Sequence, residues 1–483
     1  MTRPPYSREP ADSDRAQPIT PTLGLWDAAS IIVGIVVGTA IFKTPRMVFL
    51  NVTGPWQALG VWLMGGLLSL IGSLCYAELA TTYPRSGGDY HYLTKAFGRW
   101  MGFLFGWAQL AVILTGSIAS MAYAFADYGV QLWGAEAGEV TATLWLAAGS
   151  IVGLSVVNLL GVVVGKSVQN VLSAVKILGL VGIFMAAVLC SSRGSFESAG
   201  SPEGPGLGLA LVFVLYAYGG WNDAAFVAAE VRGRQRNLPL ALFLGIGLIT
   251  VIYLLVILAY MVVLGFDGAR ASETPAADLM QRVVGDWGRS IISGLVMVSA
   301  LGAINGLILT GSRIYASLGA DHVIFARLAS WDQRRGAPAA ALIAQGVIAL
   351  LLVLAVGTAV GRQVIDATLQ AIRLPALPWE EYYGGFETLV AGTAPVFWGF
   401  FLLTGIALFV LRQRDPHRHR PFTVPLFPLP PIIFCGMCLY MLHASLTYAK
   451  GLAIIGLLPL AVGVPLYALS QWRGRAQHAS RVE

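Results

Sequence analysis

Residues 34–42 read GIVVGTAIF, and residues 216–223 read YAYGGWND. Both stretches place small residues inside long apolar runs, where they predict breaks in membrane helices. A broken helix frees backbone N–H groups at the start of one half, which suit a carboxylate, and carbonyl groups at the end of the other, which suit an ammonium. Glycine permits the tight backbone and the close approach of a ligand. The two stretches together predict a clamp for a zwitterion that needs no charged side chain.

The composition around these stretches is that of a membrane protein. The residues AVILMFWYC make up 56% of the 483 positions, glycine adds 56 residues, and charged residues are only 12%. A soluble domain is about 45–50% apolar on the same count, with about 25% charged residues. This composition excludes a disordered chain, a coiled coil and a disulfide-stapled secreted domain. The net charge is +6, but the basic residues do not belong to a soluble domain with a basic face, so nucleic-acid binding is excluded as well.

A helix needs about 20 apolar residues to cross the bilayer core. Twelve runs satisfy this length, and the absence of ten-residue alternation favours helices over strands. They are Leu23–Phe49, Ala58–Tyr83, Phe97–Val130, Thr141–Val163, Val168–Cys190, Leu207–Ala229, Leu240–Leu264, Ser290–Gly319, Ala339–Val360, Leu389–Leu411, Pro425–Leu446 and Leu452–Trp472.

The positive charges orient these spans. With the N-terminus inside, the inner segments hold 20 Lys and Arg residues and the outer loops hold seven, with four inside helices. This asymmetry predicts that both termini are cytoplasmic. We expect a disordered cytoplasmic tail over residues 1–20, a twelve-helix domain over 21–472 and a second cytoplasmic tail over 473–483. The long outer loop 361–388 is expected to hold a short helix near Val364–Ile372.

The two breaks fall in spans one and six, the first members of two successive groups of five. Interruptions at corresponding positions of two repeats point to a transporter's binding site. The repeats would cover about 23–190 and 207–411, with the last two helices at about 425–472. The alternative is that the small residues only allow helices to pack closely.

Ionisable residues inside a membrane are functional by default. Lys176 lies mid-span in run five, and Asp223 lies at the second break. Asn305 in run eight is expected either to hydrogen-bond across helices or to line the cavity.

Near the inner ends of their spans, Glu78 and Glu230 are expected either to form gating ion pairs with arginines or to serve as boundary anchors. Arg313 is expected to be an interfacial anchor. No motif of a hydrolase, kinase, metal site or cofactor site is present, so we expect no enzyme activity, no metal and no cofactor.

Four segments resemble the amino acid–polyamine–organocation superfamily, most closely the L-type amino acid transporter light chains and their prokaryotic relatives. They are SIIVGIVVGTAIFKTP (30–45), LCYAELATTYPRSGGDYHYL (74–93), AYGGWNDAAFVAAEVRGRQRNLPLAL (217–242) and GAINGLILTGSRIYASLGADH (302–322). The resemblance implies an all-α membrane fold of twelve helices, a LeuT-type five-plus-five inverted repeat with helices 1 and 6 broken.

The resemblance also implies roles for single residues. Gly38, Thr39, Ala40 and Ile41 would form the first break and meet the substrate carboxylate. Carbonyls of Val36, Tyr216 and Gly219 would meet its amine. Tyr216 would also be an aromatic gate, and Asn222 a polar wall. Lys176 would replace a bound sodium ion and bridge spans one and eight, while Asp223 and Asn305 would belong to the coupling machinery.

Three departures from the family pattern bear on function. Gly38-Thr39-Ala40 stands where the family usually has Gly-Ser-Gly. The added methyl group restricts the conformations open to the backbone, which is expected to narrow the choice of substrate. Residues 131–140 lack the cysteine that animal light chains use to bond an ancillary subunit, so no disulfide-linked partner is expected. Gly219 stands where relatives that take cationic amino acids can carry an acid, which favours neutral substrates.

We therefore expect a sodium-independent secondary transporter of neutral L-amino acids, working by exchange or proton-linked uptake in the plasma (inner) membrane. Its partners would be the amino acid and membrane lipid, and not nucleic acid. Two alternatives stay open: a carrier of polyamines, other amines or cationic amino acids, in which Asp223 would meet the cation, and a nutrient sensor with a transporter-like fold.

Overall fold

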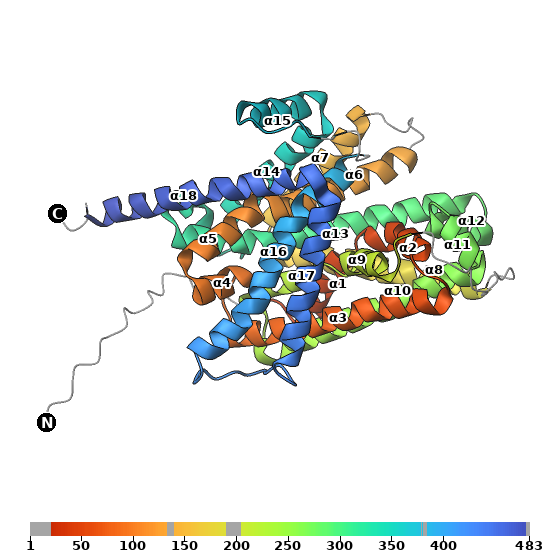
Figure 1. Ribbon diagram of the computed structural model, residues 1–483, viewed down its shortest axis with the longest axis horizontal. Coiled ribbons are helices and arrows are strands. Elements are labelled where there is room, and N and C mark those ends of the chain that lie inside the picture. Colours follow the sequence, from red (N-terminus) through yellow and green to blue (C-terminus); the bar gives the residue numbers. More distant parts are fainter. Residues whose placement is uncertain (1–20, 133–139, 190–203, 378, 380–383, 480–483) are drawn as a thin grey trace.

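A computed structural model of the chain describes residues 21–132, 140–189, 204–377, 379 and 384–479. The predicted tail 1–20, the last four residues of the second tail and Cys190 lie outside these residues. Within them the chain is almost entirely helical, and the only sheet-like pairings are two isolated bridges, Leu23 with Val231 and Asp332 with Ala337. The expected all-α class is confirmed (Figure 1).

The first half of the chain contains the expected broken span and four further long apolar segments. Helices α1 (Leu25–Val36) and α2 (Ala40–Leu50) are bent by 52° at the first break. The predicted third run consists of α5, a π-helical turn η1, and α6. The remaining elements are α3 (Pro55–Thr82), α4 (Asp89–Phe97), α5 (Arg99–Ala108), η1 (Gln109–Ile113), α6 (Leu114–Leu132), α7 (Val140–Leu159) and α8 (Val162–Leu189).

The second half repeats the pattern of a broken span followed by long helices. Here α9 (Leu207–Ala217) ends just before η2 (Trp221–Glu230), a 3-10 helix. The elements that follow are α10 (Arg234–Leu264), α11 (Phe266–Ala271), α12 (Pro275–Val284), α13 (Trp287–Asp321), η3 (Val323–Ala329), α14 (Ala339–Gly357), α15 (Ala359–Ala371) and α16 (Gly385–Arg414). Helix α15 is the short helix expected in the outer loop.

The chain ends with α17 (Leu429–Ala449), the short turn η5 (Lys450–Ala453) and α18 (Ile454–Ala479). Ten helical segments of the described residues are long and apolar enough to span a membrane, or eleven if the bent pair α1–α2 counts as one span. That count treats residues 429–475 as one segment. Figure 1 shows α18 running in a different direction from α17, so the two last apolar runs are separate helices.

Helices α1, α8 and α13 pack closely together, with side chains of α8 seated against glycines of the other two helices. A Cβ atom on Gly34 of α1 would lie 2.8 Å from Ser173 Oγ of α8, and one on Gly302 of α13 would lie 2.6 Å from Lys176 Nζ. Such spacing leaves no room for a side chain. The close packing holds the first break against two long helices at the centre of the molecule.

A cavity between the two broken spans

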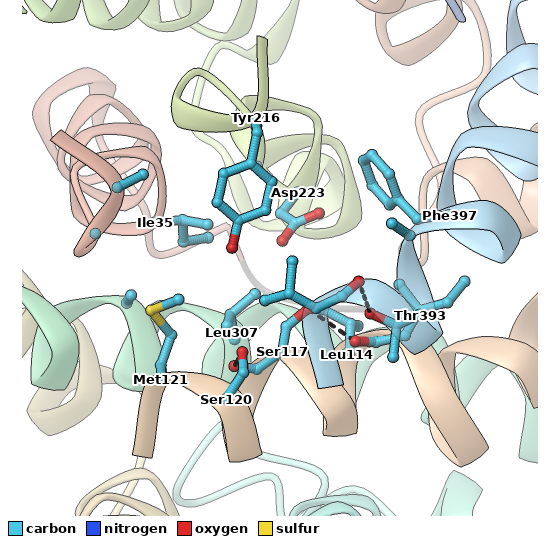
Figure 2. A pocket seen from close by; sticks show the side chains of 18 of the residues that line it. Ile35, Leu114, Ser117, Ser120, Met121, Tyr216, Asp223, Leu307, Thr393 and Phe397 are labelled. Carbon is cyan, nitrogen blue, oxygen red and sulfur yellow. Dashed lines mark hydrogen bonds between the residues drawn. The ribbon is translucent and has the colours of Figure 1, made fainter. Parts of the chain in front are cut away.

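A cavity of about 160 Å³ lies where the two broken spans face α6, α13 and α16 (Figure 2). Its walls are mostly apolar, with a few polar groups that converge on the space. They include Ile35, Val36, Gly38, Thr39, Ala40, Gln109, Ile113, Leu114, Ser117, Ser120, Met121, Tyr216, Gly219, Gly220, Asp223, Ala303, Leu307, Val390, Thr393, Ala394, Phe397 and Trp398. Apolar walls with a small number of placed polar groups are typical of small-molecule sites.

The first break directs the start of α2 at this cavity. Helix α2 begins at Ala40, so the N–H groups of its first turn have no partner within the helix. Gly38, Thr39 and Ala40 line the cavity beside them. The hydroxyl of Thr39 is fully buried and has no hydrogen-bond partner among the described residues. The break thus offers backbone donors and one hydroxyl to an anionic group.

The second break brings carbonyl groups to the same cavity. Helix α9 ends at Ala217, and the chain turns through Gly219 and Gly220 before η2. Gly220 has φ of 102°, and a Cβ atom there would lie 2.6 Å from Ile35 Cγ2 of α1. Only glycine fits both the backbone conformation and this contact. The carbonyl of Tyr216 accepts the Gly219 N–H at 3.1 Å, and both residues line the cavity.

Tyr253 of α10 joins the two breaks behind the cavity. Its hydroxyl lies 3.1 Å from the carbonyl of Val36 and 3.2 Å from that of Ala217. The Val36 carbonyl also accepts the Gly38 N–H at 2.8 Å. A tyrosine hydroxyl has one hydrogen, so Tyr253 donates to one of these two carbonyls at a time. When it donates to Val36, the Val36 carbonyl has no lone pair left for a substrate amine.

Lys176 lies outside the cavity and holds the first break from α8. It is fully buried, and its Nζ donates to the carbonyls of Gly34 at 2.7 Å and Val37 at 2.9 Å. The close approach of Gly302 places α13 against the same ammonium group. Lys176 therefore contacts α1 and α13, which correspond to spans one and eight of the resemblance.

The predicted site residues divide into two groups. Lining the cavity are Val36, Gly38, Thr39, Ala40, Tyr216, Gly219 and Asp223. Ile41, Asn222, Lys176 and Asn305 are buried behind its wall.

Among these buried residues, Asn222 donates from Nδ2 to Asp223 Oδ1 at 3.0 Å. Asn305 accepts from Asn158 at 2.8 Å and donates to Gln169 at 2.7 Å. Of the two expectations for Asn305, the hydrogen bond across helices is therefore confirmed.

Sequence reasoning missed the wall that faces the breaks. Gln109, Ile113, Ser117 and Ser120 line it from η1 and α6, spaced so that they share one helix face. Three of the four are polar within an apolar run, which is the signal that could have identified them. Figure 2 shows the Tyr216 ring pointing toward this wall, with Asp223 beside it and Phe397 of α16 at the right of the view.

Ion pairs link the ends of several spans beyond the cavity. Glu230 of η2 accepts two bonds from Arg313 of α13, at 2.7 and 3.1 Å, and both side chains are 2% exposed. Glu78 of α3 pairs with Arg412 and with Arg420, the latter at 3.4 Å. Both glutamates therefore form ion pairs, Glu78 with arginines at and after the end of α16 and Glu230 with an arginine inside α13. The gating role of these pairs stays a prediction. The prediction of Arg313 as an interfacial anchor was wrong, because the fold brings Glu230 against α13 and encloses both charges.

No group of three or more His, Cys, Asp or Glu side chains in the described part of the chain is arranged to hold a metal ion. Cys75 and Cys438 are buried thiols, and Cys435 is partly buried; all three are free.

Comparison with known proteins gives consistent matches over most of the chain. Residues 23–467 match the family model described as "Amino acid permease". The b(0,+)-type amino acid transporter 1 of Mus musculus is 31% identical over 435 residues, which cover 88% of this chain and 82% of that protein. The Asc-type amino acid transporter 1 of Mus musculus is 29% identical over 473 residues, covering 95% and 83%. The large neutral amino acids transporter small subunit 2 of Mus musculus is 30% identical over 459 residues, covering 92% and 80%.

Proposed function

Because this chain belongs to the amino acid permease family, we propose that it is a secondary transporter that carries an amino acid through the cavity between its two broken spans. The observation that carries the proposal is the meeting of both breaks at one cavity, with helix N–H groups from α2 and carbonyl groups from the end of α9. Alternating access would move the broken spans against α6, α13 and α16.

The proposed substrate is a zwitterion held by its backbone groups. Its carboxylate would face the first turn of α2 and the Thr39 hydroxyl, which has no other partner in the described residues. Its ammonium would face the carbonyls of Tyr216 and Gly219 and the carboxylate of Asp223, all of which line the cavity. The Val36 carbonyl would join them only if Tyr253 released it. Ile41 would support the carboxylate through its backbone, and Asn222 would orient Asp223.

We infer that the transported amino acids are neutral and that transport needs no sodium. Gly219 offers no acid to a cationic side chain, and the wall opposite the breaks carries only neutral polar groups, from Gln109, Ser117 and Ser120. Lys176 donates to two carbonyls of the first break, where a cation would otherwise be needed to satisfy them. The names of the relatives, which refer to amino acids and to large neutral amino acids, agree with this inference.

We also propose the finer architecture that the resemblance implies. Twelve spans result if α1–α2 and α9–η2 are one span each and α17 and α18 are counted separately. The division of Lys and Arg residues, 20 against seven, favours cytoplasmic termini and an inner-membrane location. Residues 131–140 contain no cysteine, which favours a transporter without a disulfide-linked subunit.

Uptake into proteoliposomes tests the function directly. Vesicles preloaded with unlabelled leucine should accumulate labelled leucine by counterflow, equally well in sodium and in choline buffer. Unlabelled neutral amino acids should compete, and lysine and polyamines should not. Asp223 in the cavity is the one observation that favours an amine carrier, so putrescine competing better than leucine would replace the proposed function by that alternative.

A further inference from the structure

A second buried carboxylate, Asp89, lies close to the cavity residue Asp223. Asp89 begins α4, a short helix that is not one of the candidate spans. Its Oδ1 accepts hydrogen bonds from Tyr76 of α3 at 2.5 Å and from Thr404 of α16 at 2.6 Å. Its Oδ2 is buried and has no hydrogen-bond partner among the described residues. The carboxylate is therefore only half satisfied by the protein.

Tyr92 adds a second unpartnered oxygen on the same side of α4. It lies three residues after Asp89 and so shares its helix face. The side chain is fully buried, its hydroxyl has no partner in the described part of the chain, and it interacts electrostatically with Asp89. Asp89 Oδ2 and the Tyr92 hydroxyl are therefore two neighbouring buried oxygens that no described protein group satisfies.

Asp223 connects this place to the substrate cavity. Its carboxylate lines the cavity, and its helix η2 packs on the start of α4. The Gly87 N–H donates to the Phe226 carbonyl at 2.9 Å, and a Cβ atom on Gly88 would lie 2.9 Å from the carbonyl carbon of Ala225, so the carboxylates of Asp89 and Asp223 lie near enough to repel each other. No ion pair in the described residues includes either carboxylate. The nearby arginines are engaged elsewhere, since Arg313 pairs with Glu230 and Arg412 with Glu78.

Within the described residues, none of the groups found to interact with Asp89 or Asp223 is cationic. The titratable groups facing Asp89 and Asp223 are Tyr76 of α3, Tyr92 of α4, Tyr315 of α13 and, beside Tyr76, Cys438 of α17. None of these supplies a positive charge.

Two buried carboxylates that lack a counter-ion cannot both stay ionised at low cost. Repulsion between neighbouring carboxylates is relieved when one of them takes up a proton. Burial raises the pKa of Asp89 to about 6, against the opposing effect of the hydrogen bonds from Thr404 and Tyr76. A neutral carboxyl also tolerates an unpartnered oxygen far better than a carboxylate does.

We propose that Asp89 and Asp223 together hold one exchangeable proton, which enters from the cavity and crosses the membrane with the amino acid. The step is the transfer of a proton from cavity water to a carboxylate oxygen, followed by its release to water when the cavity opens to the other side. This inference rests on the proposed function, and of the two modes expected from the sequence, exchange and proton-linked uptake, it selects the second.

Proteoliposomes that enclose a pH-sensitive dye test the proposal. With the membrane potential clamped by potassium and valinomycin, external leucine should acidify the lumen of wild-type vesicles by about one proton per leucine taken up. Asp89→Asn should abolish the acidification and keep leucine counterflow within about threefold of wild type. Asp321→Asn is the matched control, because Asp321 also accepts a tyrosine hydroxyl, that of Tyr90 at 2.9 Å, but is exposed. It should leave both signals unchanged.

A second variant separates titration from a structural role. Thr404→Val removes a hydrogen bond that stabilises ionised Asp89, so the pKa of Asp89 rises, and the pH of half-maximal proton-driven uptake should move upward by roughly one unit. Wild-type counterflow without lumenal acidification, or an unshifted midpoint in Thr404→Val, would overturn the proton site and leave the proposed function intact. Absence of counterflow in wild type would overturn both.

Discussion

Neutralising Lys176 tests whether the first break is held open by that ammonium. In Lys176→Met the side chain keeps its approximate length and loses its charge and its donors. The carbonyls of Gly34 and Val37, which accept from Lys176 at 2.7 and 2.9 Å, are then left without this partner in a buried setting. We expect α1 to rearrange around the break, because lipid and apolar side chains cannot replace these bonds.

The structure sets the size of the effect. A hydrogen bond to a charged group contributes about 1.5–3 kcal/mol, so the two bonds represent about 3–6 kcal/mol. If only the lower value for one bond, about 1.5 kcal/mol, bears on the balance between transport conformations, that balance shifts roughly tenfold. We therefore expect leucine counterflow to fall at least about tenfold in Lys176→Met.

The assay compares initial counterflow rates at equal amounts of folded, reconstituted protein, with folding judged by size-exclusion chromatography and thermal unfolding in detergent. Lys166→Met is the control on the same helix. Lys166 is 20% exposed and pairs with Asp27 at 2.9 Å, so solvent can replace part of what is lost and the decrease should be smaller. A wild-type rate in Lys176→Met would refute the assignment, as would sodium-dependent uptake by the wild type.

Three further predictions concern the cavity and the ion pair beyond it. Ala40→Val should weaken leucine binding at least tenfold by crowding the first turn of α2, and Ala40→Gly should admit a wider range of competitors; unchanged inhibition constants for both variants would misplace the carboxylate site. Tyr216→Ala should lower transport at least tenfold with little change in thermal unfolding, because the ring lines a cavity and is only partly buried; a large loss of folded protein with normal specific activity would instead make Tyr216 a packing residue. Glu230→Gln should destabilise the protein by about 3–5 kcal/mol, because Arg313 then keeps a buried charge without its partner. The Glu230→Gln/Arg313→Gln double variant should recover part of this loss in thermal unfolding, and an equal or greater loss would argue against a paired charge.

The two breaks could be predicted from the sequence because their signal is local. Gly38 and Gly219 interrupt apolar runs, and a helix that stops inside a membrane requires such residues at the break itself. The positions around them then follow by adjacency, and for this reason most of the predicted binding residues line the cavity. Asn305 of α13 lies far from either break, and its partners, Asn158 of α7 and Gln169 of α8, became known only from the packing of these helices.

The residues that escaped prediction depend on contacts between distant segments. From the sequence, Arg313 is a charged residue near a helix end, which predicts an interfacial anchor. Only the fold shows that it pairs with Glu230, 83 positions earlier. From the sequence, Asp89 is an acidic residue at the start of a helix in an inner loop. Only the fold shows that it is buried, with a hydrogen bond from Thr404, 315 positions later. Hydrophobic periodicity carries no information on which polar residue of one helix meets which residue of another.

The two breaks should recognise the amine and the carboxylate of one molecule together. Competition against labelled leucine tests it, with leucine, leucine amide and 3-methylbutylamine as the competitors, since the second lacks the carboxylate charge and the third lacks the carboxyl group altogether. We predict that leucine competes strongly and that both analogues bind at least about tenfold more weakly, because each lacks charge-assisted hydrogen bonds that contribute about 1.5 kcal/mol or more. Equal inhibition by all three compounds would contradict it.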